Sequence, residues 1–198
     1  MRRDWKKVKF LKSVYSKEGF LHFPYPVFTF CGRSNVGKSS LINLLAFNRK
    51  LAKVSSRPGK TASINYFLVD GSLVLADLPG YGYARRSKAE RERWASLMED
   101  FFRLQRGIRT NFVLIDSRIG LTPLDLQLID WLKFLGQDFA FILTKADKAK
   151  KQQIQKLVRE IAERFSRPAI PTSAKTGEGR KELISCIEKL ERGEKCLP

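Results

Sequence analysis

The chain has 198 residues, 43% of them hydrophobic, which is enough for one domain with a full core. Its 38 Lys and Arg against 20 Asp and Glu give a net charge of +18, which predicts an anionic partner, nucleic acid first and an acidic membrane surface second. No apolar run reaches the roughly 20 residues of a membrane span, and the basic N-terminus lacks the apolar segment of a secretory signal. We therefore expect a cytoplasmic protein.

Strand-like and helix-like stretches alternate along the chain, with no internal repeat. The first half predicts a short strand or arm over 8–14, a buried strand over 26–31, a helix over 37–47, a hairpin of strands over 64–70 and 72–79, and a helix over 87–106. The second half predicts strands over 111–116, 139–144 and 169–174, and helices over 122–135, 148–165 and 178–191, with Thr122 as a cap and Pro123 at the first helical position.

This order predicts an α/β domain with a mostly parallel sheet, helices on both faces and one antiparallel strand from the hairpin. We expect a basic arm or short strand over 1–22, the domain over 23–192 and a short tail over 193–198. The three cysteines, Cys31, Cys186 and Cys196, show no CxxC or Cys/His spacing. We expect them to be free thiols in a reducing compartment, not disulfide or zinc ligands.

The stretch from Gly32 to Ser39 fits the pattern G-x-x-x-x-G-K-[ST] and lies between a predicted strand and a predicted helix. In such a loop the backbone N–H groups and the helix dipole bind phosphate, Lys38 reaches the β- and γ-phosphates, and Ser39 gives an oxygen to Mg²⁺. The pattern predicts binding of a nucleoside triphosphate but does not choose between ATP and GTP. The predicted phosphate-binding residues are Gly32, Arg33, Ser34, Asn35, Val36, Gly37, Lys38, Ser39 and Ser40.

Three later segments each follow a predicted strand, and together they indicate that the nucleotide is GTP and not ATP. Asp77 at a strand end can hold Mg²⁺, and the N–H of Gly80 can contact a γ-phosphate. Asp147 can accept hydrogen bonds from the N1 and N2 donors of guanine, a pair that adenine lacks, while Lys145 packs its stem on the base and the N–H of Ala174 supports O6. The predicted residues are Asp77, Leu78, Pro79, Gly80, Thr144, Lys145, Ala146, Asp147, Thr172, Ser173, Ala174 and Lys175.

The stretches "GRSNVGKSS", "PGKT", "DLPGYGYA", "TKAD" and "SAK" resemble the EngB-type GTP-binding proteins, and the resemblance runs from about Pro24 to the last helix. It implies a three-layer Ras-like P-loop GTPase fold with a mostly parallel six-stranded sheet and one antiparallel strand. It also implies a Mg²⁺-dependent GTPase active in assembly of the large ribosomal subunit. Pro58, Gly59, Lys60 and Thr61 match the first switch, where Thr61 would bind Mg²⁺ and sense the γ-phosphate. Lys38, Thr61 and Gly80 are the expected catalytic residues.

Three positions bear on hydrolysis. Tyr81 stands where many GTPases have a water-orienting glutamine, so we expect slow intrinsic hydrolysis that a partner or an ion accelerates. Asn35 either helps to hold a potassium ion beside the phosphates or is only a turn residue, and the sequence leaves both open. Arg33 could act as an arginine finger, but we expect a solvent-facing loop residue.

Positive charge is concentrated in residues 1–20, with seven basic and two acidic side chains, in residues 49–60, with five and none, and around 81–88. Two of these segments flank or form the switches, so nucleotide state could set the affinity for rRNA. The alternative is that the tyrosines pack inward and the arginines are solvated. Two other functions stay open, a P-loop ATPase or kinase and a switch at a membrane or division site, and we expect a monomer without a stable membrane anchor.

Overall fold

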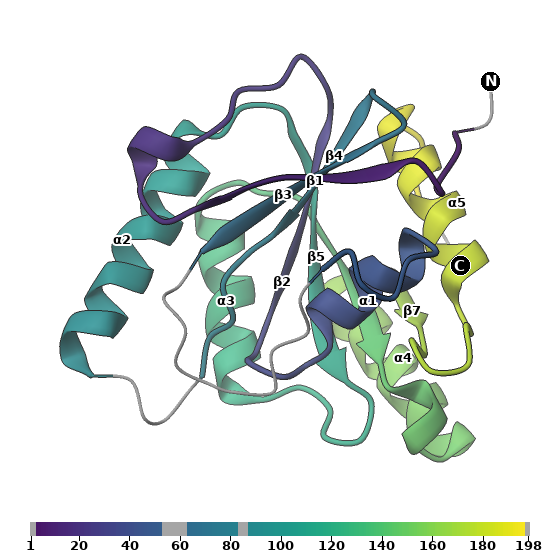
Figure 1. Cartoon of the computed structure of the whole chain (residues 1–198). Coiled ribbons are helices and arrows are strands. Elements are labelled where there is room, and N and C mark those ends of the chain that lie inside the picture. Colours follow the sequence, from purple (N-terminus) through teal and green to yellow (C-terminus); the bar gives the residue numbers. More distant parts are fainter. Residues whose placement is uncertain (1–2, 53–62, 83–86, 197–198) are drawn as a thin grey trace.

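We describe residues 3–52, 63–82 and 87–196 of a computed structural model of the chain. Within them the strands form one sheet of seven in the order β1-β3-β4-β2-β5-β6-β7 (Figure 1). The strands are β1 (Val8–Val14), β2 (Val27–Gly32), β3 (Ile64–Val69), β4 (Leu73–Asp77), β5 (Ile108–Asp116), β6 (Phe139–Thr144) and β7 (Ala169–Pro171). All six residues of β2 are buried, as expected for a central strand covered on both faces.

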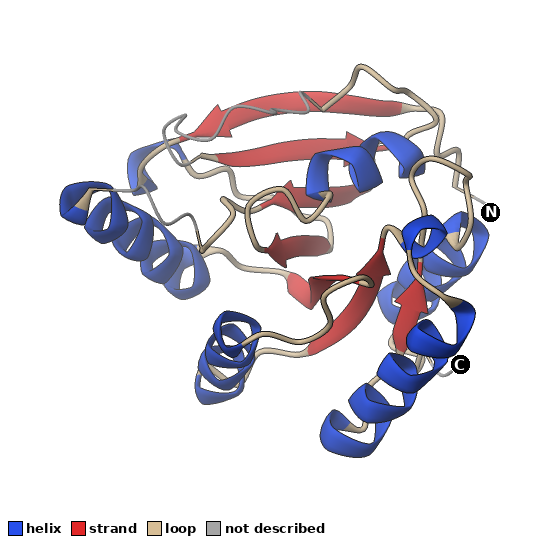
Figure 2. Cartoon of the chain, turned by 90° about the horizontal axis from the view of Figure 1, so that it is seen from below, coloured by secondary structure: helices blue, strands red, loops and turns tan. Residues whose placement is uncertain are grey.

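The directions of the strands confirm a mostly parallel sheet with one antiparallel strand. Only β3 runs against its neighbours β1 and β4, and the other described pairs are parallel. The expected count of six strands is wrong by one. The seventh is β1, which pairs with β3 from Val8 opposite Val69 to Val14 opposite Ile64 and lies outermost, at the top of Figure 2.

Helices cover both faces of the sheet and complete three layers. The described α-helices are α1 (Lys38–Leu45), α2 (Lys88–Leu104), α3 (Pro123–Phe134), α4 (Lys151–Phe165) and α5 (Arg180–Glu191), with single 3₁₀ turns η1 (Lys17–Gly19) and η2 (Ala146–Lys148). One apolar cluster packs α2, α3 and α4 against the sheet, and a second packs α1 and α5 against the opposite face. Figure 1 shows α2 and α3 to the left of the sheet and α1 and α5 to the right. No helix among the described residues is long and apolar enough to cross a membrane.

The two ends of the chain meet on α5. Arg3 donates to both carboxylate oxygens of Glu191, and the indole of Trp5 donates to Glu188 over 3.2 Å. Cys186 in α5 and Cys196 are joined by a disulfide across 5.1 Å between their Cα atoms, so the expectation of free thiols is wrong for this pair. The chain reverses after α5, and Gly193 has a φ of +77° in that turn. This reversal brings together two cysteines that show neither CxxC nor Cys/His spacing in the sequence. The third cysteine, Cys31, is a free thiol and is buried.

Candidate nucleotide-binding site

The loop between β2 and α1 has backbone conformations that its sequence makes possible. Gly37 precedes α1 with a φ of +113°, a region that glycine enters without a steric penalty, and Asn35 has a φ of +64°. A Cβ on Gly32 would lie 2.8 Å from Cγ1 of Val36 and 3.1 Å from Cβ of Leu114, so the strand end needs glycine for a close approach. The loop leads into the amino end of α1, where unpaired N–H groups and the helix dipole favour an anion.

The segment after β4 packs directly on this loop. A Cβ on Gly80 would lie 3.0 Å from the backbone N and Cα of Ser34 and 3.1 Å from Nζ of Lys38, so only glycine fits. The N–H of Ser34 donates to the carbonyl of Tyr81 over 2.9 Å. The N–H of Tyr81 donates in turn to the carbonyl of Gly32 over 3.4 Å, so two predicted motifs more than 40 residues apart in the sequence are joined by backbone hydrogen bonds.

A buried carboxylate lies beside the start of α1. The hydroxyl of Ser39 is 3.3 Å from Oδ2 of Asp77, while Oδ1 of Asp77 is buried and has no hydrogen-bond partner among the described residues. Burial raises the pKa of Asp77, and the nearby Lys38 and Ser39 oppose that rise. A hydroxyl and an unsatisfied carboxylate oxygen are hard ligands of the kind Mg²⁺ prefers, so these two residues fit the ion.

The base-reading motif is anchored to the last strand. Asp147 lies in η2, and its Oδ1 accepts a 2.6 Å hydrogen bond from the hydroxyl of Ser173, which is fully buried. The N–H of Ala146 donates to the carbonyl of Thr172 over 3.0 Å. The predicted "TKAD" and "TSAK" segments are therefore in contact, and the hydroxyl of Ser173 orients the carboxylate of Asp147.

The same motif is tied to the phosphate loop. Nζ of Lys145 donates to the carbonyl of Asn35 over 2.7 Å and to Oδ2 of Asp116 over 2.9 Å. The hydroxyl of Thr144 donates to the carbonyl of Val36 over 2.7 Å. These bonds fix the distance between the base end and the phosphate end of the site.

Asp116, at the end of β5, is a site residue that the sequence reasoning missed. It accepts a bidentate pair from Arg118 at 2.9 and 2.6 Å as well as the bond from Lys145. Burial alone would raise the pKa of Asp116, but the hydrogen bonds from Arg118 and Lys145 outweigh burial and hold the pKa below its usual range. The strand "NFVLID" ends in Asp116 just as the earlier strand "SLVLAD" ends in Asp77. This similarity could have identified Asp116 as a candidate site residue.

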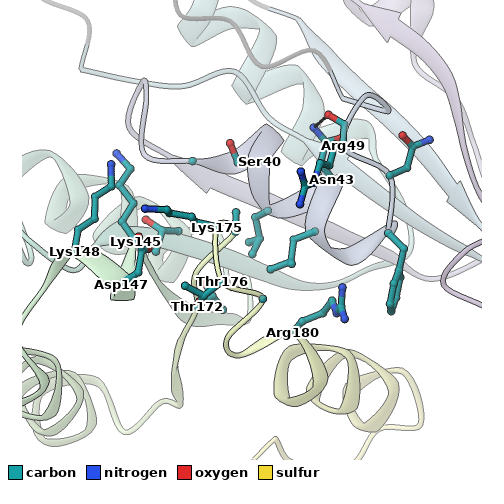
Figure 3. A pocket seen from close by; sticks show the side chains of 18 residues that line it. Ser40, Asn43, Arg49, Lys145, Asp147, Lys148, Thr172, Lys175, Thr176 and Arg180 are labelled. Carbon is teal, nitrogen blue, oxygen red and sulfur yellow. Dashed lines mark hydrogen bonds between the residues drawn. The ribbon is translucent and has the colours of Figure 1, made fainter.

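A pocket of about 630 Å³ opens beside these residues. Figure 3 shows Lys145, Asp147, Lys148 and Lys175 on one side and Asn43, Arg49 and Arg180 on the other. Residues around Phe47 after α1 and Arg180 at the start of α5 were not predicted; the guanidinium of Arg180 lies 3.9 Å from the centroid of the Phe47 ring. Predicted residues that line the pocket are Gly37, Ser40, Thr144, Lys145, Asp147, Thr172, Ala174 and Lys175.

Other predicted residues have different environments. The side chain of Leu78 is in the core at 1% exposure, and the carbonyl of Pro79 accepts a bond from the indole of Trp94 in α2. Both residues therefore support the segment instead of facing a ligand with their side chains. The first-switch residues Pro58, Gly59, Lys60 and Thr61 lie outside the described residues, as do Tyr83, Arg85 and Arg86.

Tyr81 and Arg33 meet at a buried acid. The hydroxyl of Tyr81 donates to Oδ1 of Asp125 over 2.8 Å, and Nε of Arg33 lies 3.5 Å from the same oxygen. Asp125 is fully buried near the start of α3, and burial together with this acid raises the pKa of Tyr81. The expectation that Arg33 faces solvent is wrong, because its side chain is only 19% exposed. The Asp125 contact holds it toward α3.

Comparisons with known proteins agree with this geometry. A family model described as "50S ribosome-binding GTPase" matches residues 27–145. The probable GTP-binding protein EngB of Aquifex aeolicus is 45% identical over 91% of this chain and 98% of that protein, and that of Thermotoga maritima is 48% identical over 81% and 84%.

Solved structures give the same fold. A crystal structure of a probable GTP-binding protein EngB has a TM-score of 0.68 at 25% identity, covering 85% of this chain and 99% of that one. Era in complex with MgGDPNP and nucleotides 1506–1542 of 16S ribosomal RNA has a TM-score of 0.66 at 22% identity, covering 85% of this chain and 57% of Era. The loop of residues 32–40, the buried Asp77 and Asp147 thus lie in a GTPase domain, and the chain belongs to the EngB family of GTP-binding proteins.

Proposed function

We propose that this GTPase is a nucleotide-controlled switch that assists assembly of the large ribosomal subunit by binding rRNA. The net charge of +18 carries the proposal, because guanine nucleotide and Mg²⁺ do not account for so large an excess of basic residues. The description of the matching family as 50S ribosome-binding supports it. A cytoplasmic monomer, with its domain over 23–192, is the form in which we expect it to act.

We assign the phosphates to the loop of residues 32–40 and the guanine to Asp147, Lys145 and Ala174. Ser39 and Asp77, with Thr61, would hold Mg²⁺, which when bound compensates the negative charge of the phosphates. Lys38 binds phosphate oxygens, and the N–H of Gly80 would sense the γ-phosphate.

Slow hydrolysis by the isolated protein follows from the position of Tyr81. Its hydroxyl is bonded to Asp125, so this side chain does not orient the attacking water in this conformation. The side chain of Asn35 is exposed beside the loop, where it could help to bind a potassium ion. Turnover measured in potassium and in sodium salts tests this role, and equal rates would remove it.

Co-sedimentation with purified ribosomal subunits tests the proposal. The protein is incubated with small or large subunits and either a nonhydrolysable GTP analogue or GDP, over a series of salt concentrations. We expect binding to the large subunit that favours the nonhydrolysable GTP analogue over GDP and falls steeply with salt. Equal, weak binding to both subunits in both states would contradict it, and binding to anionic vesicles at physiological salt would instead favour a switch at a membrane.

A further inference from the structure

The free edge of the sheet carries an unusual set of exposed side chains. β1 is the edge strand, outermost in Figure 2, and pairs only with β3 among the described residues. Phe10 is 48% exposed, Leu11 37% and Tyr15 59%. Exposed lysines lie near them on β1 and on the residues just before and after it. We call the set the β1 surface: Lys6, Lys9, Phe10, Leu11, Lys12, Tyr15 and Lys17.

A bulge in β1 aligns two of these lysines. The register with β3 shifts between Phe10 and Lys12, which places Lys9 opposite Leu68 and Lys12 opposite Tyr66. Leu68 and Tyr66 are two residues apart in β3 and so lie on the same face of the sheet. The lysines opposite them therefore also lie on one face, although they are three residues apart in the sequence. Without the bulge Lys12 would lie on the opposite face from Lys9. The bulge therefore makes a pair of cations about 7 Å apart along the strand.

Basic residues outnumber acidic ones on this surface. Residues 4–18 contain five lysines, and the two acids of this stretch, Asp4 and Glu18, lie at its ends. Lys7 makes only long contacts of 3.9 Å, to Asp4 and to Asp70. Within the described residues Lys6, Lys9, Lys12 and Lys17 make no salt bridge of 4.0 Å or less. The surface thus presents a row of cations available to an anionic partner.

Lysines on an edge strand also have a simpler explanation, since they discourage pairing with other strands. That explanation does not account for Phe10, Leu11 and Tyr15, because exposed apolar side chains favour association. Phe10 also has a fixed position, with its ring 5.6 Å from the buried Phe67 ring in an edge-to-face contact. Phe10 is opposite Phe67 and therefore lies on the other face of the sheet from Lys9 and Lys12, with the strand edge between them. Cations beside exposed aromatic rings are the combination that binds single-stranded nucleic acid.

We propose that the β1 surface binds unpaired RNA along the strand edge. Lys9 and Lys12 would contact successive phosphates on one face, and Phe10 on the other face and Tyr15 just after the strand would stack on bases. The proposal rests on the proposed function, of which it would be one RNA contact. The surface lies on the sheet edge, whereas the nucleotide site lies at the carboxyl ends of the strands. Changes at β1 should therefore leave GTP binding unaltered.

The test uses the full chain and two probes, a fluorescent single-stranded oligouridylate of 20 nucleotides and purified large ribosomal subunits. The double variant Lys9→Gln/Lys12→Gln is compared with Lys151→Gln/Lys156→Gln on α4, where both lysines are exposed, so the change in net charge is the same. We expect the β1 variant to reduce the slope of log affinity against log salt by about 1.4, or 0.7 for each phosphate contact. The α4 variant should leave that slope unchanged.

Tyr15→Ala adds a readout that charge alone would not move. We expect oligouridylate binding to weaken about fivefold or more with an unchanged salt slope, because a stacking contact is lost without loss of an ionic one. Affinity for GTP should equal that of the wild type in every variant, which also checks folding.

The outcomes separate this inference from the proposed function. If the β1 and α4 variants lose RNA affinity equally, or neither loses any, the inference is overturned. It is overturned too if the β1 variant weakens binding to anionic vesicles but not to RNA. If oligouridylate binding depends on β1 while wild-type protein ignores large subunits, the inference holds and the proposed function fails.

Discussion

At the scale of single residues, Asp147 is the group that we propose distinguishes guanine from other bases. Its carboxylate has only acceptor oxygens, one of them oriented by the hydroxyl of Ser173 at 2.6 Å. In Asp147→Asn an amide replaces one acceptor with a donor, which opposes guanine N1–H and N2–H but suits the O2 carbonyl of xanthine. We expect GTP affinity to fall about 100-fold or more and affinity for xanthosine triphosphate to rise, measured by fluorescent-nucleotide titration.

Ser173→Ala is the matched smaller change. It leaves the carboxylate in place but removes its orienting hydrogen bond, so GTP affinity should fall by a factor of about ten or less without any gain for xanthosine triphosphate. Equal losses for the two nucleotides in Asp147→Asn would contradict the assigned role of this residue.

Asp77 is the residue that we propose binds Mg²⁺. Its Oδ1 is buried without a partner among the described residues, which is costly unless a cation is bound there. In Asp77→Asn the anionic ligand is lost, and we expect the preference for GTP with Mg²⁺ over GTP with EDTA to disappear in calorimetric titrations. Asp130→Asn, at an exposed position on α3, is the control and should keep the wild-type preference. A full Mg²⁺ effect in Asp77→Asn would remove Asp77 from the metal site.

At the scale of elements, Asp125 joins the phosphate loop, the segment after β4 and α3. Its Oδ2 accepts from the N–H and the hydroxyl of Thr122, and its Oδ1 accepts from Tyr81. Tyr81→Phe removes one donor to a fully buried carboxylate, so we expect the free energy of unfolding in urea to fall by about 1–3 kcal/mol. Tyr15→Phe, at an exposed hydroxyl, should change it little.

The same variant tests the role of Tyr81 in hydrolysis. The hydroxyl of Tyr81 is hydrogen-bonded to Asp125, so we do not expect it to orient the attacking water. The single-turnover rate of Tyr81→Phe at saturating GTP should therefore stay within a few-fold of the wild-type rate. A loss of 100-fold or more would show that the phenol contributes to the chemistry.

The junction of β5, β6 and the phosphate loop depends on an ionised Asp116. The folded-state pKa of Asp116 lies below its usual value, so its stabilisation is present above the unfolded-state pKa near 3.9 and is lost as the pH falls through the folded pKa. We expect Asp116→Asn to cost about 1–3 kcal/mol of unfolding free energy at pH 7. The difference from the wild type should narrow below about pH 4; a difference independent of pH would contradict this assignment.

At the scale of the whole molecule, the Cys186–Cys196 disulfide closes a short loop that holds the chain end on α5. Closing a loop of this length restricts the unfolded chain, so reduction should lower the unfolding free energy by about 2–3 kcal/mol. Urea unfolding with and without dithiothreitol measures this, and Cys196→Ser should show no effect of the reductant. Alkylation of all three cysteines in unreduced, denatured protein would show that the bond does not form.

Features that depend on neighbouring residues could be predicted from the sequence. Gly32, Lys38, Asp77 and Asp147 could be predicted to lie together because each is within a few residues of a predicted strand end, and parallel strands bring their carboxyl ends to one edge. The alternation of strand and helix likewise determined the class of fold.

Contacts between groups that are far apart in the sequence could not be predicted and are known from the fold. Tyr81 and Asp125 are 44 residues apart in the sequence, and Lys145 and Asn35 are 110 apart. No sequence pattern around either residue of a pair predicts its contact with the other. The pairing of β1 with β3 and the disulfide on α5 have the same cause. An edge strand and a chain reversal find their partners only once the rest of the fold has formed. The energy of each contact depends on groups that are distant in the sequence.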